Sequence, residues 1–409
     1  MKRILTIVIL FFTGMAVSSQ DMSFLTTEYM RTDGTFAERL ATLEAARDTG
    51  YTGIGEFYHN ALKYFIARAP DIRSKAEQDD AEKSAIIICQ GLGAEKYSAA
   101  AGEVWQLVEL FDVVRVANDG NTMQTALITL GQIDAKDFVP QIVQRLNNFN
   151  TQTISNKETR RRVQMGVIGC INALEALHDI RGYRPVFFVT VGTYDPEVRK
   201  IASDALPNIT EDPGEVIIEI INDTSSDPRV KLTAWREMLR TRAQGPSKAK
   251  VASVALAIGW LYATTNPNFQ RNLREMRKEA IDTIRQYGAA DPSVYTNMEF
   301  SYSRNFANAS PDYDEIMLTL NTLTALSTEE AVNLLYGFLR DLNERRRRNV
   351  WSNKEKRIFD WVVACLGKTG TQSVDVRILL TTIQRTNDYT PAERNMVANA
   401  MKELGYAPR

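Results

Sequence analysis

Residues 195–199 read Asp-Pro-Glu-Val-Arg and residues 227–231 read Asp-Pro-Arg-Val-Lys, and each motif is followed by an alanine, Ala202 and Ala234 respectively. An aspartate accepts hydrogen bonds from the free amides of a helix's first turn, and a proline at the next position has no N–H to satisfy and a φ already suited to the helix. Both motifs therefore predict helix starts. Between them, Glu-Asp-Pro at 211–213 predicts a short, largely apolar helix over 215–221. The predicted unit is a helix, a tight turn and a second helix.

Such a pair cannot bury its apolar face alone, so neighbouring pairs must cover one another, as they do in stacked repeat proteins. The spacing Asp-Pro-x-Val-(Arg/Lys)-x-x-Ala resembles that of the HEAT-repeat family of α-solenoids. This resemblance, here to a bacterial secreted member, implies a curved superhelical scaffold whose concave side holds a partner. It implies no particular reaction.

The same organisation extends along the chain. Leucines that end helical patterns before a glycine or a short polar turn, such as Leu92, Leu130 and Leu366, recur at roughly the 40-residue length of a HEAT-type unit. Capping boxes are predicted at 155–158, 327–330 and 352–355, where a serine precedes a glutamate by three residues. Residues 187–191 have strand propensity, but their position requires the second helix of a unit. We therefore predict an all-α, right-handed α-solenoid of about nine to ten HEAT-like pairs over residues 36–409, with an insertion around 289–311.

The N-terminus has the features of a secretory signal. Lys2 and Arg3 precede an apolar run over 4–17, and Ala-Val-Ser-Ser at 16–19 suits cleavage. Residues 1–19 are predicted to be a signal peptide, in preference to an uncleaved membrane anchor, and residues 20–35 an extended arm. The expected location is periplasmic or secreted, with no stable membrane insertion after cleavage.

Composition limits the possible partners. The 409 residues are 44% hydrophobic and 24% charged, with a formal net charge of −1. A nearly neutral chain has no global field to attract nucleic acid, so we expect none as a partner. The three cysteines, Cys89, Cys170 and Cys365, lie in apolar helical runs at spacings that suit neither a disulfide framework nor a metal site. We expect these three cysteines to be small residues of the core.

No catalytic, cofactor or metal site is predicted. The two histidines, His59 and His178, lie in neither a zinc motif nor a recognisable triad. The glycines at 53 and 55, and those at 91 and 93, fall short of a dinucleotide-binding motif, and helix termination explains them better. Acidic residues at 79, 80 and 82 suit a helix N-terminus. We therefore expect a protein that is not an enzyme.

Candidate partner-binding residues fall in three groups. Residues 345–348 are four arginines that also suit a helix C-terminus. Residues 160–162 are three arginines inside a predicted helix, where the helix dipole does not favour them, so they either face solvent or line a ridge that holds an acidic partner. Aromatic residues crowd 295–313, either exposed for protein contact or part of the core. The candidates are Arg160, Arg161, Arg162, Arg345, Arg346, Arg347, Arg348, Tyr295 and Tyr302.

The leading hypothesis is a non-enzymatic periplasmic scaffold or adaptor. It would bind another protein of the cell envelope, for instance in a motility or secretion machine, through a concave ridge of second helices. One alternative is a module that binds anionic cell-wall polymer through its arginine ridges. Another is an enzyme or lyase built on a HEAT-like fold, which would need acidic or histidine side chains converging in the groove.

Overall fold

The computed structural model describes residues 19–116 and 118–406, with side chains from residue 23 onward. These residues form helices joined by turns and short loops, and no β-strand lies among them. The chain divides into two compact units, of which the first ends at Glu211 and the second begins at Asp212. The predicted signal peptide lies outside the described residues except for Ser19, where the first helix begins.

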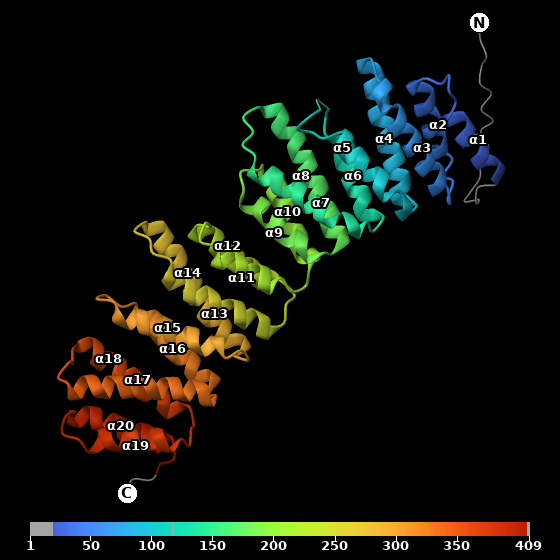
Figure 1. The fold of residues 1–409 in the computed structure, drawn as a ribbon. Helices are drawn as coiled ribbons and strands as arrows, with labels where there is room; N and C mark the ends of the chain where they lie inside the picture. Colours follow the sequence, from blue (N-terminus) through green and yellow to red (C-terminus); the bar gives the residue numbers. More distant parts are fainter. Residues whose placement is uncertain (1–18, 117, 407–409) are drawn as a thin grey trace. The chain divides into compact units, whose positions relative to one another are not determined.

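The first unit consists of five antiparallel pairs, α1/α2 to α9/α10, that follow one another in chain order (Figure 1). Short 3₁₀ turns lead into several of its helices. The helices are α1 Ser19–Tyr29, α2 Phe36–Asp48, α3 Gly55–Arg68, α4 Lys75–Ala94, α5 Ala101–Leu110, α6 Asn121–Gln132, α7 Val139–Thr151, α8 Lys157–Leu177, α9 Tyr183–Val191 and α10 Pro196–Ile209.

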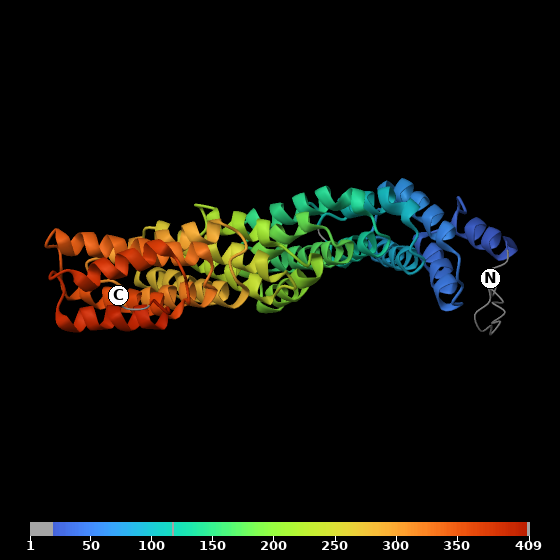
Figure 2. The same ribbon diagram turned by 90° about the horizontal axis from the view of Figure 1, so that it is seen from below.

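The second unit repeats this arrangement with five further pairs, α11/α12 to α19/α20 (Figure 1, Figure 2). Its helices are α11 Gly214–Asn222, α12 Pro228–Arg240, α13 Gly245–Leu261, α14 Pro267–Tyr287, α15 Ser293–Ala307, α16 Tyr313–Leu326, α17 Glu329–Arg347, α18 Asn353–Lys368, α19 Val374–Arg385 and α20 Pro391–Glu403. Ten pairs in the described chain confirm the predicted all-α solenoid and its number of units.

In each unit the helices form two rows. Even-numbered helices contact the next even-numbered helix without interruption, and odd-numbered helices form the second row, whose contact between α5 and α7 is weaker. The even row also brings backbones close together. A Cβ added to Gly169 of α8 would lie 3.0 Å from the Cα of Gln124 on α6, and one added to Gly367 of α18 would lie 3.0 Å from the Cα of Ala400 on α20. Small residues thus allow close approach at these two places. In the first unit and from α16 to α20 the even row is the more closely packed of the two, whereas from α11 to α16 the odd row is.

The pairing differs from the predicted one in its register. The sequence suggested that the helix starting at Pro196 pairs with the short helix that follows it. In the structure α10 pairs with α9, and α11 pairs with α12. Both motif prolines therefore begin second helices, and the boundary between the units falls between them. A motif marks where a helix begins, but which neighbour covers its apolar face is a tertiary choice.

The extended arm predicted for residues 20–35 is wrong, because α1 occupies most of it and packs on α2 and α3. Tyr29 is only 1% exposed and meets the ring of Phe57 edge-on. Arg39 fixes the turn that follows by donating to the carbonyls of Tyr29 and Arg31. The repeat region therefore begins before residue 36. Its start was missed because α1 carries little apolar periodicity, and buried Leu25 and Tyr29, one turn apart, do much of its packing.

The insertion predicted around 289–311 is also wrong. α15 is a regular helix that continues to Ala307 and forms a pair with α16. Residues 187–191, in contrast, lie in helix α9 as predicted.

The predicted helix caps are partly confirmed. Ser352 forms the expected capping box with Glu355. The other two caps are displaced by one residue, to Asn156, which accepts from the amides of Glu158 and Thr159, and to Thr328, which accepts from Ala331. Adjacent side chains of similar capping strength compete at these sites, and the backbone path decides between them.

The glycines at 91 and 93 do not terminate a helix, because both lie inside α4. A Cβ at Gly91 would come within 2.2 Å of the Tyr58 ring, and one at Gly93 within 1.9 Å of the Gln132 side chain. Gly91 needs to be glycine because the rigid Tyr58 ring packs directly against the helix backbone, whereas the flexible end of Gln132 could move away from a side chain at position 93. Gly53, with φ of +77°, does serve in a turn.

Candidate interaction surface

The three arginines at the start of α8 are explained in part by local contacts. Arg160 donates to the carbonyl of Ile154 at 2.9 Å. Arg162 donates to Thr159 Oγ1 at 3.1 Å and approaches the carbonyl of Val116 at 3.4 Å, so it holds the loop that precedes α6. Arg161 is exposed and forms no hydrogen bond or ion pair with any described residue. Of this cluster, only Arg161 is left entirely available to a partner.

The arginines of residues 345–348 lie at the C-terminal end of α17, as predicted. Arg345 pairs with Asp341 at 3.0 Å and covers the Phe306 ring. Arg346 donates to the carbonyl of Asp388 at 2.6 Å, and Arg347 pairs with Glu344 at 3.3 Å. Arg348 is exposed and has no side-chain partner among the described residues. Arg345 and Arg346 thus reach neighbouring segments of the chain, whereas Arg347 pairs within its own helix. Because residues 160–162 belong to the other unit, the common ridge suggested by the sequence stays a prediction.

Tyr295 and Tyr302 are core residues, which corrects their assignment as partner-binding candidates. They are 8% and 6% exposed. The Tyr295 hydroxyl lies 2.6 Å from Thr328 Oγ1, and the Tyr302 ring stacks on Phe338 with centroids 3.7 Å apart. Burial raises the pKa of the Tyr302 phenol well above its usual range. Both rings fill the contact between α15 and the following pair, because successive turns of a helix place them on one face.

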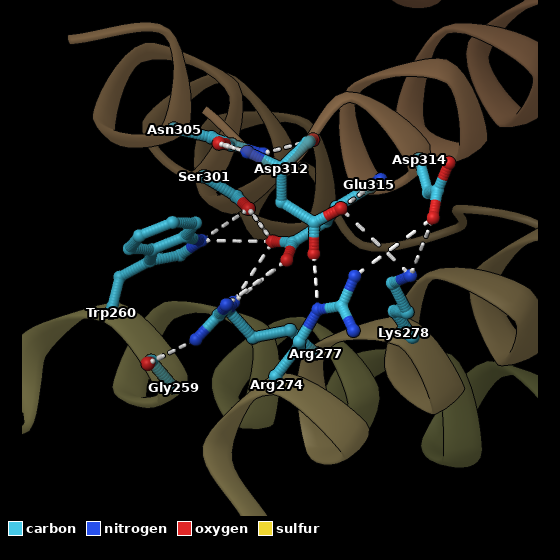
Figure 3. A network of polar contacts seen from close by, with 10 residues as sticks. All are labelled: Gly259, Trp260, Arg274, Arg277, Lys278, Ser301, Asn305, Asp312, Asp314 and Glu315. Atoms are coloured by element: carbon cyan, nitrogen blue, oxygen red, sulfur yellow. Dashed lines mark hydrogen bonds and ion pairs between the residues drawn. The ribbon is translucent and has the colours of Figure 1, made fainter. Parts of the chain in front are cut away.

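A buried polar network that the sequence did not suggest joins α13, α14, α15 and α16 (Figure 3). Arg277, 8% exposed, donates through Nε and Nη2 to the carboxylate of Glu315, 1% exposed, at 2.9–3.1 Å. Its guanidinium lies 3.9 Å from the Trp260 ring centroid and also donates to the carbonyl of Gly259. The Trp260 indole N–H donates to Ser301 and to Glu315. Each charge is therefore paired, as burial requires.

Towards the surface this network continues through Asp312, the N-cap of α16. Asp312 pairs with Arg274, and its backbone exchanges two hydrogen bonds with the amide of Asn305 (Figure 3). Lys278 lies 3.7 Å from Asp314. Burial alone would raise the pKa of Asp312, but the hydrogen bonds from Arg274 and the Glu315 amide, together with nearby Lys278, outweigh it and hold this pKa below its usual value. The converging carboxylates are thus engaged in ion pairs.

A second group, which the sequence did not reveal, lies on the solvent-exposed face of the even row, between α16 and α18. The Arg357 guanidinium lies 4.4 Å from the Tyr313 ring centroid and 4.6 Å from that of Trp361. The two rings meet edge-on with centroids 6.0 Å apart. Both rings are half-buried, whereas Arg357 is exposed. The sequence signal was the spacing of Arg357 and Trp361 by one helical turn, but Tyr313 is 44 residues away from Arg357 along the chain.

The two histidines have local structural partners. His178 ends α8 in a left-handed conformation, with Nδ1 2.6 Å from the carbonyl of Asn208, and His59 lies 3.2 Å from a Glu103 carboxylate oxygen. The three cysteines are buried and unpaired, and burial raises the pKa of Cys89 and of Cys170 to about 12. No group of His, Cys, Asp and Glu side chains in the described ranges is arranged to hold a metal ion. None of the helices searched there combines the length and apolar character of a membrane span.

Two rows of stacked helix pairs define the class of protein, an all-α helical-repeat protein of the α-solenoid type. No protein-family model matches the chain, and no curated protein matches it. Solved structures that resemble it include an engineered protein, 14% identical with a TM-score of 0.35, the match covering 94% of this chain and 99% of that one. Human deoxyhypusine hydroxylase in complex with glycerol is 12% identical with a TM-score of 0.26, covering 95% and 97%. Similarity this low carries no functional argument, and the HEAT family stays a resemblance.

Proposed function

We propose that this protein is a non-enzymatic scaffold that binds another protein of the cell envelope along the solvent-exposed face of its row of even-numbered helices. The observation that carries the proposal is the exposed arginine–aromatic group on that face, formed by Arg357, Tyr313 and Trp361. Arginine, tyrosine and tryptophan are the residue types that contribute most to protein interfaces. The even-numbered helices are the second helices of their pairs, which the HEAT resemblance places on the partner side.

The packing of the even row favours the same face. In a stack of repeats, the row whose helices approach more closely lies on the inside of any bend, and inner surfaces of solenoids present long, continuous binding sites. From α16 to α20, where the arginine–aromatic group lies, the even row is the closer of the two, and the contact of Gly367 with Ala400 belongs to it. The envelope location rests on the signal-like N-terminal sequence.

The two alternatives receive less support. An anionic polymer would need several neighbouring free cations. Within the two arginine clusters, however, only the side chains of Arg161 and Arg348 lack a partner among the described residues. An enzymatic role would rest on Asp312 and Glu315, which are engaged by Arg274 and Arg277. The proposed function therefore includes neither polymer binding nor catalysis.

Site-specific photo-crosslinking in intact cells tests the proposed function. A photoreactive amino acid would replace exposed Asn321 or Ala364 on the even row, with exposed Thr296 or Ser303 on the odd row as matched controls. We expect one protein to be captured from both even-row positions and not from the controls, as identified by mass spectrometry. Equal capture from both rows, or no protein adduct from the even row, would contradict the proposal.

A further inference from the structure

The α16–α18 patch, which we define as Tyr313, Met317, Arg357 and Trp361, holds a cation in a fixed orientation without neutralising it. Arg357 forms no hydrogen bond or ion pair with any described side chain or backbone group. Its contacts are the faces of two aromatic rings, which restrict the guanidinium plane and leave its N–H edges unused. A guanidinium held in this way is preorganised to bind a carboxylate through two parallel hydrogen bonds.

Four cations around Arg357 are already engaged. Lys356 pairs with Asp360 at 3.0 Å, and Lys354 donates to the carbonyl of Phe306 at 3.1 Å. On the neighbouring helix α14, Arg274 and Lys278 face Asp312 and Asp314. The patch therefore offers one directed positive charge and not a general positive field, so it suits a single acidic group better than a polymer of phosphates.

Apolar side chains also lie on the two helices that carry this charge. Met317 lies one turn after Tyr313 on α16 and is half-buried, and Ala364 lies about one turn after Trp361 on α18 and is exposed. A thioether and an indole beside an arginine form an adaptable apolar floor next to a directed polar contact. A partner segment with an apolar side chain next to its carboxylate would satisfy both parts of the patch.

We infer that the α16–α18 patch binds an acidic peptide segment of a protein partner, with an aspartate or glutamate carboxylate on Arg357 and a neighbouring apolar side chain on Trp361 and Met317. This inference rests on the proposed function and names the kind of partner that it would engage. Arg357 is the residue that determines specificity, and the two rings position it.

The test measures fluorescence anisotropy of the full chain with a fluorescein-labelled peptide of alternating glutamate and leucine. The matched peptide replaces each glutamate with glutamine. We expect the acidic peptide to bind at least about tenfold more tightly than the neutral one. Arg357→Gln is expected to abolish this preference. Arg357→Lys is expected to lose most of it, because lysine keeps the charge but not the planar pair of donors.

Arg271→Gln is the matched control, because Arg271 is an exposed arginine of the even row that likewise has no partner among the described residues. Its peptide affinity is expected to equal that of the unsubstituted protein. Circular dichroism would establish that each variant keeps its helical content. The inference is overturned if the acidic peptide does not bind, if it binds no better than the neutral one, or if Arg271→Gln weakens it as much as Arg357→Gln.

A polyphosphate of matched length separates the two kinds of anion. Tighter, Arg357-dependent binding of polyphosphate would overturn the peptide assignment in favour of an anionic polymer. Crosslinking from Asn321 and Ala364 then distinguishes this inference from the proposed function. If one protein is still captured there by the Arg357→Gln variant, the scaffold function stands and only the role of the patch is wrong.

Discussion

Lys231 and Arg199 occupy the same position in the two copies of the Asp-Pro motif, yet their environments differ. Lys231 is 1% exposed, and its Nζ donates to the carbonyls of Ile221 and Asp223 at 2.5 and 2.6 Å, so it closes the C-terminal end of α11. Burial lowers its pKa, against the influence of Asp223 and Asp227. Arg199 is exposed. One motif position therefore serves as an internal cap in one copy and as a surface residue in the other.

Replacing these two residues should have unequal effects. Lys231→Met leaves two carbonyls at the end of α11 without a donor, so we expect the free energy of unfolding to fall by about 1–3 kcal/mol. Arg199→Met is expected to change it by less than about 0.5 kcal/mol. Urea denaturation followed by circular dichroism measures both values. Equal losses would show that the Lys231 contacts contribute nothing specific.

The Asp312 carboxyl links stability to acid pH. Its pKa is held below the ordinary value of 3.8, so the folded protein favours the charged form more than the unfolded chain does. The resulting stabilisation is complete above 3.8 and is lost as the pH falls through the lower folded value. The difference in unfolding free energy between the unsubstituted protein and Asp312→Asn should therefore shrink on acidification, as measured by urea titrations from neutral pH to about pH 2.5.

Asp314→Asn provides the control for this pH dependence, because the Asp314 side chain is 82% exposed and its ion pairs are screened by solvent. We expect its pH profile to follow that of the unsubstituted protein. A difference for Asp312→Asn that stays constant across the titration would mean that the Arg274 pair does not shift this carboxyl.

At the scale of the helix, the two Asp-Pro starts are not equivalent. Asp227 accepts hydrogen bonds from the amides of Arg229 and Val230 at 2.8 and 2.9 Å. Asp195 stands at the N-cap of α10 with an extended backbone, but its side chain caps no amide. Proline preorganises both helix starts, and only α12 gains the side-chain cap as well.

Asp227→Ala should therefore destabilise the protein by about 1 kcal/mol, the usual effect of losing an N-cap side chain. Asp195→Ala should cost a few tenths of a kcal/mol at most. Thermal unfolding of both variants beside the unsubstituted chain gives the comparison. A loss for Asp195→Ala as large as that for Asp227→Ala would mean that both aspartates cap their helices in solution.

At the scale of the molecule, each pair is stabilised mainly by its neighbours. The cores run continuously along the rows of each unit, as Leu130 of α6 shows, since it is fully buried in a helix that contacts α4 and α8. Stability in such a stack is a sum of repeat and interface terms, so damage is felt first next to its source.

Leu130→Ala should cost about 2–5 kcal/mol by leaving a cavity. Hydrogen exchange followed by mass spectrometry is expected to show faster exchange in α4, α6 and α8, while α16 to α20 of the other unit keep their protection. Uniformly faster exchange along the chain would indicate a single cooperative unit. A cost below about 1 kcal/mol would mean that Leu130 does not belong to the core.

The sequence by itself determined the features that depend on neighbours a few residues apart. The Asp-Pro starts, the Ser352–Glu355 box and the buried cysteines follow from spacing along one helix and its first turn. The helix at 187–191 and the number of helix pairs follow from the recurrence of such signals about every 40 residues. Such patterns act within one or two turns, so they can be recognised without knowing what the helix packs against.

Only the tertiary structure decided which helices form pairs, that α1 closes the first pair, and that Tyr295 and Tyr302 are buried while Arg357 is not. Arg277 and Glu315 meet across 38 residues, and Arg357 meets Tyr313 across 44, through contacts between stacked helices. Burial and ion pairing depend on distance in space, and the stacking of repeats sets that distance separately from separation along the chain.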